Sequence, residues 1–123
     1  MQVLCVDDSP LTRTYMKRVV RRIAPNATAL GCRDPEEAVQ NARAKGCDVL
    51  IAEIELAGST RGGLDLARKI REINPRVNII FVTVFSPREY AGELMELHVS
   101  GYLTKPLNQE KLTEEFANLR YPI

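Results

Sequence analysis

Several features of this 123-residue sequence are scarce, and each scarcity excludes a class of protein. His98 is the only histidine, and the three cysteines, Cys5, Cys32 and Cys47, form no C-x-x-C pair. The ligands of a zinc site and the spacing of a disulfide framework are therefore both missing. We interpret the cysteines as small residues of the core in a reducing compartment, since the sequence gives no support for a redox-sensing role.

Long apolar runs and an excess of one charge are also missing. The first apolar segment, residues 2–6, is too short for the apolar region of a signal peptide or for a membrane span. The 17 basic side chains nearly balance the 16 acidic ones, so the net charge predicts no nucleic-acid partner. Because 45% of the residues are hydrophobic and 27% are charged, the composition is that of a globular chain. We expect one soluble, cytoplasmic domain with a single core.

What the sequence does contain is an alternation of two kinds of segment. Short apolar runs rich in β-branched residues alternate with longer stretches whose apolar residues recur at helical spacing. The runs at 49–52 and 79–82 are apolar at successive positions, which is typical of central strands covered on both faces. Strands are predicted at residues 2–6, 27–31, 49–53, 78–83 and 101–104.

Helix starts are marked by three pairs, Ser9-Pro10, Asp34-Pro35 and Ser86-Pro87. Each pair places a capping side chain before a proline at the first helical position. Apolar periodicity predicts two more helices at about 63–73 and 108–119. Five strands alternating with five helices predict a doubly wound α/β domain: a five-stranded parallel sheet of the flavodoxin-like order 2-1-3-4-5, in a three-layer α/β/α arrangement.

Polar side chains stand at the carboxyl ends of the predicted strands, where ligands bind in such sheets. Asp7 and Asp8 follow the first strand, Glu53 ends the third, Thr83 ends the fourth, and the fifth runs into Lys105. Two carboxylates about 4 Å apart repel by roughly 4 kcal/mol at an effective dielectric of about 20. Three carboxylates facing one lysine would attract a divalent cation, for which magnesium is the best match. The structural alternative is that the aspartates cap the next turn and the lysine is a solvated strand end.

Three motifs follow one another along the chain: Val6-Asp7-Asp8, Phe81-Val82-Thr83-Val84 and Gly101-Tyr102-Leu103-Thr104-Lys105-Pro106. Together they make the chain resemble a response-regulator receiver domain of two-component signalling, similar to the chemotaxis regulators, over residues 1–120. Val6-Asp7-Asp8 resembles the family's acidic pair after the first strand. The run Phe81-Val82-Thr83-Val84 resembles the fourth strand with its switch hydroxyl, and Gly101-Tyr102-Leu103-Thr104-Lys105-Pro106 is similar to the last strand. The resemblance implies a non-enzymatic signalling module.

In that family an aspartate at the end of the third strand accepts a phosphoryl group from a histidine kinase, beside a magnesium ion held by the acidic pair. The apolar run of the third strand puts Glu53 at the acceptor position, because Asp48 stands at the beginning of the strand. The resemblance implies a metal set of Asp7, Asp8, Glu53 and the backbone carbonyl of Glu55. It leaves weak or absent Mg²⁺ binding open.

Replacement of aspartate by glutamate adds a methylene and displaces the acceptor oxygen. Because phosphoryl transfer depends on positioning and charge stabilisation, we expect no efficient phosphorylation of Glu53. Glu53 can instead bond to Lys105, and to Thr83, without any phosphate. Two interpretations stay open: a phosphomimetic that holds an active-like state, or an inert site whose domain is retained for binding.

The resemblance also assigns a signalling path. Thr83 and Tyr102 would be switch residues that shift together, Lys105 would belong to the phosphate site, and the peptide bond before Pro106 is a candidate for the cis form. Structurally, Thr83 can equally be a β-branched strand residue and Tyr102 a half-buried aromatic. The signal would reach the face of the fourth helix, fifth strand and fifth helix, for homodimerisation or for control of an output domain, often in transcription regulation. Residues 121–123 would begin a connector to such a domain.

Two segments depart from the simplest picture. The loop at 57–63 lacks the family's Pro-Gly pair and is about two residues longer, which predicts a looser rim of the site. A basic run on the first helix is interpreted as a solvated face, or alternatively as a docking site for an acidic kinase or phosphotransfer protein. Its members are Lys17, Arg18, Arg21 and Arg22. Without a recognition-helix motif, direct nucleic-acid binding is not expected.

Three rival functions can be weighed against these residues. A metal-dependent phosphatase or hydrolase would lack a nucleophilic aspartate at the third strand and a histidine near the cluster. A flavodoxin-like cofactor binder would have Asp7-Asp8 where a phosphate-cradling loop is needed, and the two charges would repel a phosphate. A conventional phosphorylatable regulator that uses a non-standard acceptor remains an alternative.

Overall fold

The computed structural model describes residues 1–122 and contains one parallel sheet. Its strands lie in the order β2-β1-β3-β4-β5, which confirms the predicted topology. The predicted boundaries of two strands were wrong by one residue, because Val6 pairs with both Cys32 and Ala52: the second strand extends to Cys32, and the third ends before Glu53. The strands are β1 (Gln2–Val6), β2 (Thr28–Cys32), β3 (Val49–Ala52), β4 (Asn78–Thr83) and β5 (Gly101–Thr104).

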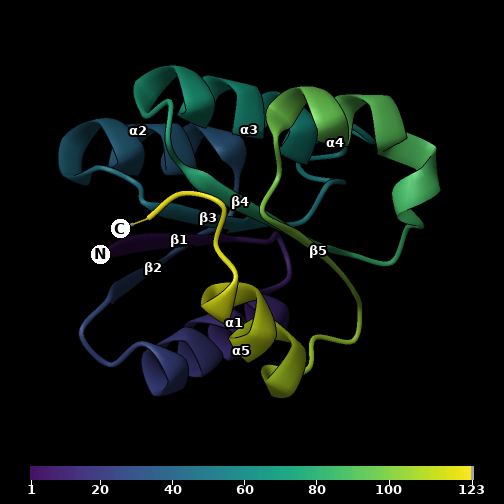
Figure 1. Cartoon of the computed structure of the whole chain (residues 1–123). Helices are drawn as coiled ribbons and strands as arrows, with labels where there is room; N and C mark the ends of the chain where they lie inside the picture. Colours follow the sequence, from purple (N-terminus) through teal and green to yellow (C-terminus); the bar gives the residue numbers. More distant parts are fainter. Residues whose placement is uncertain (123) are drawn as a thin grey trace.

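Helices cover both faces of this sheet, as the three-layer prediction requires (Figure 1). One layer contains α2, α3 and α4, and the other contains α1 and α5. A 3₁₀ turn, η1, precedes α4. The bounds are α1 (Pro10–Ile23), α2 (Pro35–Lys45), α3 (Gly62–Ile73), η1 (Pro87–Tyr90), α4 (Ala91–Leu97) and α5 (Gln109–Ala117).

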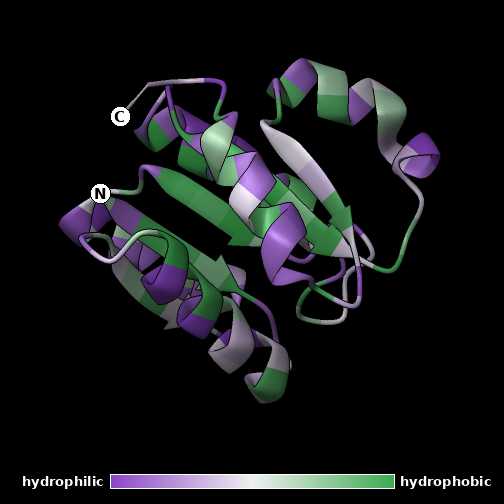
Figure 2. Cartoon of the chain, turned by 60° about the horizontal axis from the view of Figure 1, so that its bottom comes forward, coloured by the Kyte–Doolittle hydropathy of each residue, from purple (hydrophilic) through white to green (hydrophobic). Residues whose placement is uncertain are grey.

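The central strands supply a core on each side of the sheet, because successive side chains of a strand point to opposite faces. Leu4 and Leu50 are fully buried on the side of α2 and α3, whereas Val3 and Ile51 are fully buried on the side of α1 and α5. Figure 2 shows central strands that are largely hydrophobic, flanked by helices in which hydrophilic and hydrophobic residues alternate. Among residues 1–122, no helix has the length and apolar character needed to cross a membrane.

The predicted capping residues begin two helices as expected. The Ser9 hydroxyl accepts from the Thr12 N–H of α1, and the Asp34 carboxylate accepts from the Glu37 N–H of α2 at 2.8 Å. At the third pair, Pro87 begins a 3₁₀ turn rather than an α-helix, since the Glu89 N–H donates to the Ser86 carbonyl three residues earlier. The α-helix follows at residue 91.

The segment after α5 is bound to the amino-terminal edge of the sheet. The side chain of Asn78, fully buried at the start of β4, donates to the Tyr121 carbonyl at 2.9 Å and accepts from the Tyr121 N–H at 2.8 Å. The Ser100 hydroxyl donates to the same amide oxygen, and the Arg71 guanidinium lies 5.3 Å from the centre of the Tyr121 ring. Of the predicted connector, Tyr121 and Pro122 are described, while residue 123 lies outside the described residues.

Candidate functional site

The hydrogen-bond ladder of the sheet continues one residue past the strands and brings the predicted site residues to one edge. The Glu53 N–H donates to the Val6 carbonyl at 3.0 Å, and the Lys105 N–H donates to the Thr83 carbonyl at 2.7 Å. Asp7 follows Val6 directly, so its side chain lies beside these two. The parallel sheet therefore assembles an acidic and a basic group that are separated by up to 98 positions in the sequence.

Asp7, Glu53 and Lys105 form an ionic triad at this edge. The Lys105 ammonium nitrogen lies 2.9 Å from Asp7 Oδ2 and 2.9 Å from Glu53 Oε1. The side chains of Asp7, Glu53 and Lys105 are 1%, 9% and 22% exposed. Burial disfavours the charged form of Lys105, but hydrogen bonds and charge attraction from Glu53 and Asp7 outweigh it and raise the pKa of Lys105. The predicted bond between Glu53 and Lys105 is present.

The remaining carboxylate oxygens of the triad are also bonded within the protein. Asp7 Oδ1 accepts from the Ser9 N–H at 2.8 Å, and Glu53 Oε2 accepts from the Ile54 N–H at 2.7 Å. Arg13 donates to the Asp7 carbonyl at 2.8 Å, which fixes the backbone of the acidic segment. All four carboxylate oxygens thus have a hydrogen-bond donor.

This arrangement does not fit a magnesium ion as it stands. The side chains of Asp8 and Glu55 are exposed, and within residues 1–122 no three His, Cys, Asp or Glu residues are placed to hold a metal ion. A divalent cation between Asp7 and Glu53 would have to displace the Lys105 ammonium. The predicted set of Asp7, Asp8, Glu53 and the Glu55 carbonyl therefore stays a prediction.

The two predicted switch residues both form hydrogen bonds with the backbone of Phe85, a residue for which no role was predicted from the sequence. Tyr102 donates from its hydroxyl to the Phe85 carbonyl at 2.7 Å, and the Phe85 N–H donates to Thr83 Oγ1 at 3.5 Å. Burial raises the pKa of Tyr102 to about 12. The Phe85 ring packs edge-on against Tyr90, with ring centres 6.2 Å apart. Among the described residues, Thr83 makes no hydrogen bond to Glu53, so that predicted alternative partner is not used.

The rim after β3 begins with a tight turn, while the looser rim predicted for residues 57–63 stays a prediction. Leu56 and Ser59 exchange two backbone hydrogen bonds of 3.1 and 2.9 Å around Ala57 and Gly58. Both central residues have positive φ, 54° and 76°, as a two-residue hairpin turn of this hand requires. The position of this turn was hard to predict because Ala57 occupies a place where glycine or asparagine is usual.

Close packing at the start of α3 fixes the backbone of Glu53. The Gly63 N–H donates to the Ile54 carbonyl at 2.6 Å. A Cβ on Gly63 would collide with the Glu53 carbonyl oxygen and would lie 2.7 Å from the Ile54 Cα. Glycine is thus needed here for a close approach of two backbones. The Gly-Gly pair before a predicted helix was the available sequence signal for this contact.

The structure also bears on four other predictions from the sequence. The peptide bond between Lys105 and Pro106 is cis, as predicted. Asp48 lies at the opposite edge, where its carboxylate accepts from the Gln2 N–H at 2.7 Å. The cysteines are buried and free, as expected for core residues. The arginines of the basic run are exposed, and none of the run forms an ion pair within residues 1–122, which agrees with a solvated helix face.

Comparison with known proteins assigns the family. The family model of the response regulator receiver domain matches residues 3–117, so the chain belongs to this family. The response regulator GacA of Pseudomonas aeruginosa is 30% identical over 126 residues, covering 98% of this chain and 58% of that protein. The response regulator UvrY of Escherichia coli O6:H1 is 31% identical over 105 residues, covering 85% of this chain and 47% of that protein. The chain spans about half the length of these curated relatives.

Solved structures agree on the fold. The chemotaxis protein CheY4 of Vibrio cholerae is similar with a TM-score of 0.82 and 23% identity, over 94% of this chain and 95% of that one. A response regulator of Burkholderia pseudomallei with a phosphorylated aspartic acid, a calcium ion and citrate has a TM-score of 0.80 at 21% identity, over 97% and 66%. The present chain is a receiver module of a two-component response regulator, and receiver domains are generally non-enzymatic signalling modules that bind Mg²⁺ at the acceptor site.

Proposed function

We propose that this receiver signals without being phosphorylated, because Glu53 occupies the acceptor position and is already bound by Lys105. The observation that carries the proposal is the pair of 2.9 Å contacts from the Lys105 ammonium to Glu53 Oε1 and Asp7 Oδ2. An ammonium engaged by two buried carboxylates is not free to bind the oxygens of an incoming phosphoryl group. The lysine that would bind a phosphoryl group is thus already engaged by Asp7 and Glu53.

The carboxylate of Glu53 is also poorly prepared to act as an acceptor. One oxygen faces Lys105, and the other accepts from the Ile54 N–H at 2.7 Å. An attack on phosphorus requires an oxygen aligned with the donor, and an error of about 1 Å in its position can reduce a rate by about 100-fold. Breaking either bond before transfer would add to this barrier.

The contacts of Thr83 support an inert site rather than a phosphomimetic one. A phosphate mimic should engage both the lysine and the switch hydroxyl. Here Glu53 bonds to Lys105 but not to Thr83, whose Oγ1 accepts from the Phe85 N–H. Glu53 reproduces only one of the two contacts, so in this proposal the switch is held in a single state.

Proteins would then be the partners of this cytoplasmic module. A groove of about 530 Å³ beside Lys105 is lined mainly by apolar residues, among them Leu11, Tyr15, Val84 and Leu107. Leu11 and Val84 are 85% and 63% exposed, which supports docking of a kinase or phosphotransfer protein. An output domain would contact α4, β5 and α5, where Met95 is also exposed. Control of transcription is the corresponding output.

Mass spectrometry of the intact protein tests the proposal. The protein is treated with a small-molecule acyl phosphate and Mg²⁺, and wild type is compared with Glu53→Asp. We expect no phosphoryl adduct on wild type and a base-labile adduct on Glu53→Asp, since shortening the side chain frees Lys105 and restores an aspartate acceptor. The matched control is Glu55→Asp, the same change on an exposed neighbour, which should stay unlabelled.

Two outcomes oppose the proposal. An adduct on wild type that is mapped to Glu53 would show that the glutamate is an acceptor after all. An adduct on wild type at another residue would favour a regulator with a non-standard acceptor. If neither protein is labelled, the other residues of the site cannot support phosphorylation even of an aspartate, although Glu53 is still a non-acceptor.

A further inference from the structure

A second surface of the molecule is a groove between α2 and α3. It has a volume of about 660 Å³ and includes Pro35, Glu36, Val39, Gln40 and Arg43 from α2, and Lys69 from α3. Lys105, Asp7 and Glu53 do not line it, so it is separate from the ionic triad.

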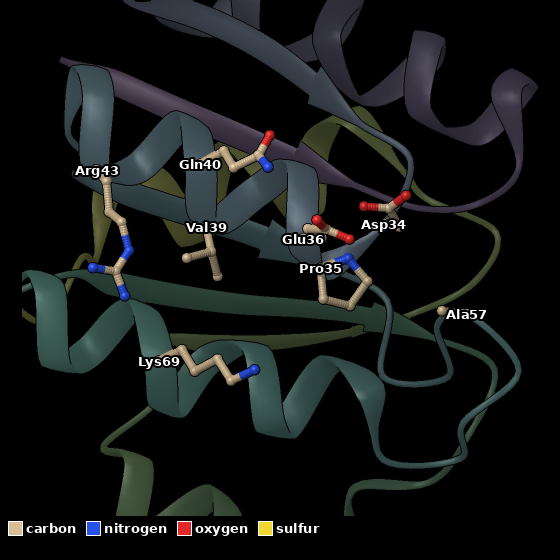
Figure 3. Close-up of a pocket in the computed structure, with 8 residues that line it drawn as sticks. All are labelled: Asp34, Pro35, Glu36, Val39, Gln40, Arg43, Ala57 and Lys69. Carbon is tan, nitrogen blue, oxygen red and sulfur yellow. The ribbon is translucent and has the colours of Figure 1, made fainter.

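The charges of this groove are separated along its length. Figure 3 shows the carboxylates of Asp34 and Glu36 at one end, the guanidinium of Arg43 at the other, and the ammonium of Lys69 between them. Asp34 is used as the cap of α2 and lies 3.8 Å from Arg33. Glu36, Arg43 and Lys69, by contrast, form no ion pair with any of residues 1–122. The groove therefore presents unpaired charges of both signs.

The spacing of the α2 residues makes this pattern self-complementary. Glu36, Gln40 and Arg43 are exposed and follow one another at intervals of four and three residues, so they form a single stripe on the helix. Seven residues of α-helix span about 10.5 Å, and the middle of the stripe falls at Val39 and Gln40. Turning the helix by 180° about that midpoint exchanges the positions of the carboxylate and the guanidinium.

We propose that the groove between α2 and α3 binds a second copy of this chain, with the two α2 helices antiparallel. In this arrangement Glu36 of each copy faces Arg43 of the other, and Lys69 of each copy lies near the middle of the contact. Gln40 lies near the two-fold axis, where its amide can both donate to and accept from the other Gln40. Val39 supplies an apolar side chain at the centre, and Pro35 supplies one at each end. Each surface is used twice, as a closed two-fold dimer requires.

The mixture of charges favours a second copy over an acidic protein partner. An acidic partner would be attracted by Arg43 and Lys69 but repelled by the carboxylates of Asp34 and Glu36 at the other end of the groove. A second copy in the antiparallel orientation matches both ends at once. Because few apolar residues line the groove, the association should be weak and sensitive to salt.

Analytical ultracentrifugation with charge-swapped variants provides the test. Wild type, Glu36→Arg, Arg43→Glu and the double variant are compared from about 10 μM to about 1 mM at low and high salt, a range suited to weak association. We expect a concentration-dependent dimer of wild type, and a tenfold or greater weakening in each single variant, because like charges then face each other. The double variant should regain the wild-type dimerisation constant.

Mixing the two single variants gives a second measurement. Glu36→Arg carries two positive residues on the stripe and Arg43→Glu carries two negative ones, so an equimolar mixture should form a heterodimer although neither variant dimerises alone. Glu110→Arg, a charge reversal on an exposed carboxylate of α5, is the matched control and should dimerise like wild type. Circular dichroism melting of each variant checks that it is folded.

Three results would overturn the inference. Wild type that stays monomeric over the whole range excludes the dimer. A dimer that tolerates both single reversals but is lost in Glu110→Arg places the contact on α5 instead. If Arg43→Glu abolishes dimerisation while the double variant and the mixture fail to restore it, Glu36 and Arg43 are not opposite one another.

Discussion

The two edges of the sheet both bury polar side chains, but they do so with different chemistry. At the carboxyl edge, Asp7 and Glu53 are charged and share the ammonium of Lys105. At the amino edge, Asn78 is neutral and its amide matches the backbone N–H and C=O of Tyr121. The first set connects the ends of three strands to one another, and the second binds the segment after α5, so the edges differ in charge and in what they hold.

This difference determines how each edge should respond to change. Breaking a buried ion pair leaves an uncompensated charge, which destabilises by about 3 to 5 kcal/mol. Losing a neutral amide that binds a terminal segment costs less, about 1 to 3 kcal/mol, because the freed backbone groups can return to water. The carboxyl edge is thus built to hold one ionic arrangement, and the amino edge to hold a segment of chain.

Removal of the lysine should produce the largest effect. Lys105→Met keeps most of the apolar stem but leaves Asp7 and Glu53 facing each other with no cation. We expect the free energy of unfolding to fall by about 3 kcal/mol, measured by urea denaturation at neutral pH. Lys111→Met, an exposed lysine of α5, is the control and should change it little. Equal effects of the two substitutions would mean that the triad contributes no special stability.

The free energy of unfolding of wild type and of Lys105→Met should also depend differently on pH. The pKa of Lys105 is raised in the folded state, so its stabilising contribution is complete below the ordinary value of 10.5 and is lost as pH rises through the folded pKa. The gap in unfolding free energy between wild type and Lys105→Met should therefore be constant from pH 7 to 10 and narrow above about 10.5.

Cysteine ionisation should not obscure that comparison. Burial raises the pKa of Cys5 and Cys47 to about 12 and that of Cys32 to about 11, from 9.0. Stability is therefore lost as pH rises above 9 in both proteins, and the loss cancels in their difference. A gap that stays constant to pH 12 would contradict the raised pKa of Lys105.

A substitution at Gly63, which packs against the backbone of Glu53, should destabilise the protein nearly as much as removal of Lys105. Gly63→Ala puts a methyl group against the Glu53 carbonyl, and the crowding should lower the free energy of unfolding by about 2 kcal/mol. The matched control is Gly92→Ala in α4, where an added Cβ has no neighbour within 4 Å. That variant should be stabilised by about 0.5 kcal/mol, because alanine favours the helix. Two stabilised variants would show that the approach of α3 to Glu53 is loose.

A substitution at the amino edge should lower the free energy of unfolding less, and its effect on hydrogen exchange should be confined to that edge. Asn78→Ala removes three side-chain hydrogen bonds at a fully buried position and should lower the free energy of unfolding by about 1.5 kcal/mol. Hydrogen exchange of the Tyr121 amide should become faster, while that of the Glu53 amide should be unchanged. Asn118→Ala on the exposed end of α5 is the control. Unaltered exchange at Tyr121 would disprove the contact.

The smallest effect is expected at the rim of the carboxyl edge. Ala57 has a φ of 54°, a conformation that disfavours residues with a Cβ. Ala57→Gly should relieve this strain and, after the added entropy of the unfolded chain, raise the free energy of unfolding by about 0.5 kcal/mol. Ala44→Gly, on the exposed side of α2, should instead lower it by about 1 kcal/mol. Destabilisation by both would mean that the turn tolerates alanine without strain.

Much of the fold was predictable because local signals agreed with one another. The apolar runs predicted the five strands, the Ser-Pro and Asp-Pro pairs predicted helix starts, and the alternation of elements led to the strand order that is found. Glu53 and Lys105 were predicted to meet because parallel strands end at a common edge. In the loop of residues 57–63 the glycines permitted turns, but composition did not predict that the turn would close around Ala57 and Gly58.

The sequence by itself determined which residues reach the carboxyl edge, since strand register follows from the apolar pattern. Only the tertiary structure decided which contacts these residues make. Lys105 bridges Asp7 and Glu53. Thr83 and Tyr102 form hydrogen bonds with the backbone of Phe85. The physical reason is that strand order depends on period and polarity along the chain, which are local. The partner of a buried charge depends instead on distances of a few ångströms between residues that only folding brings together.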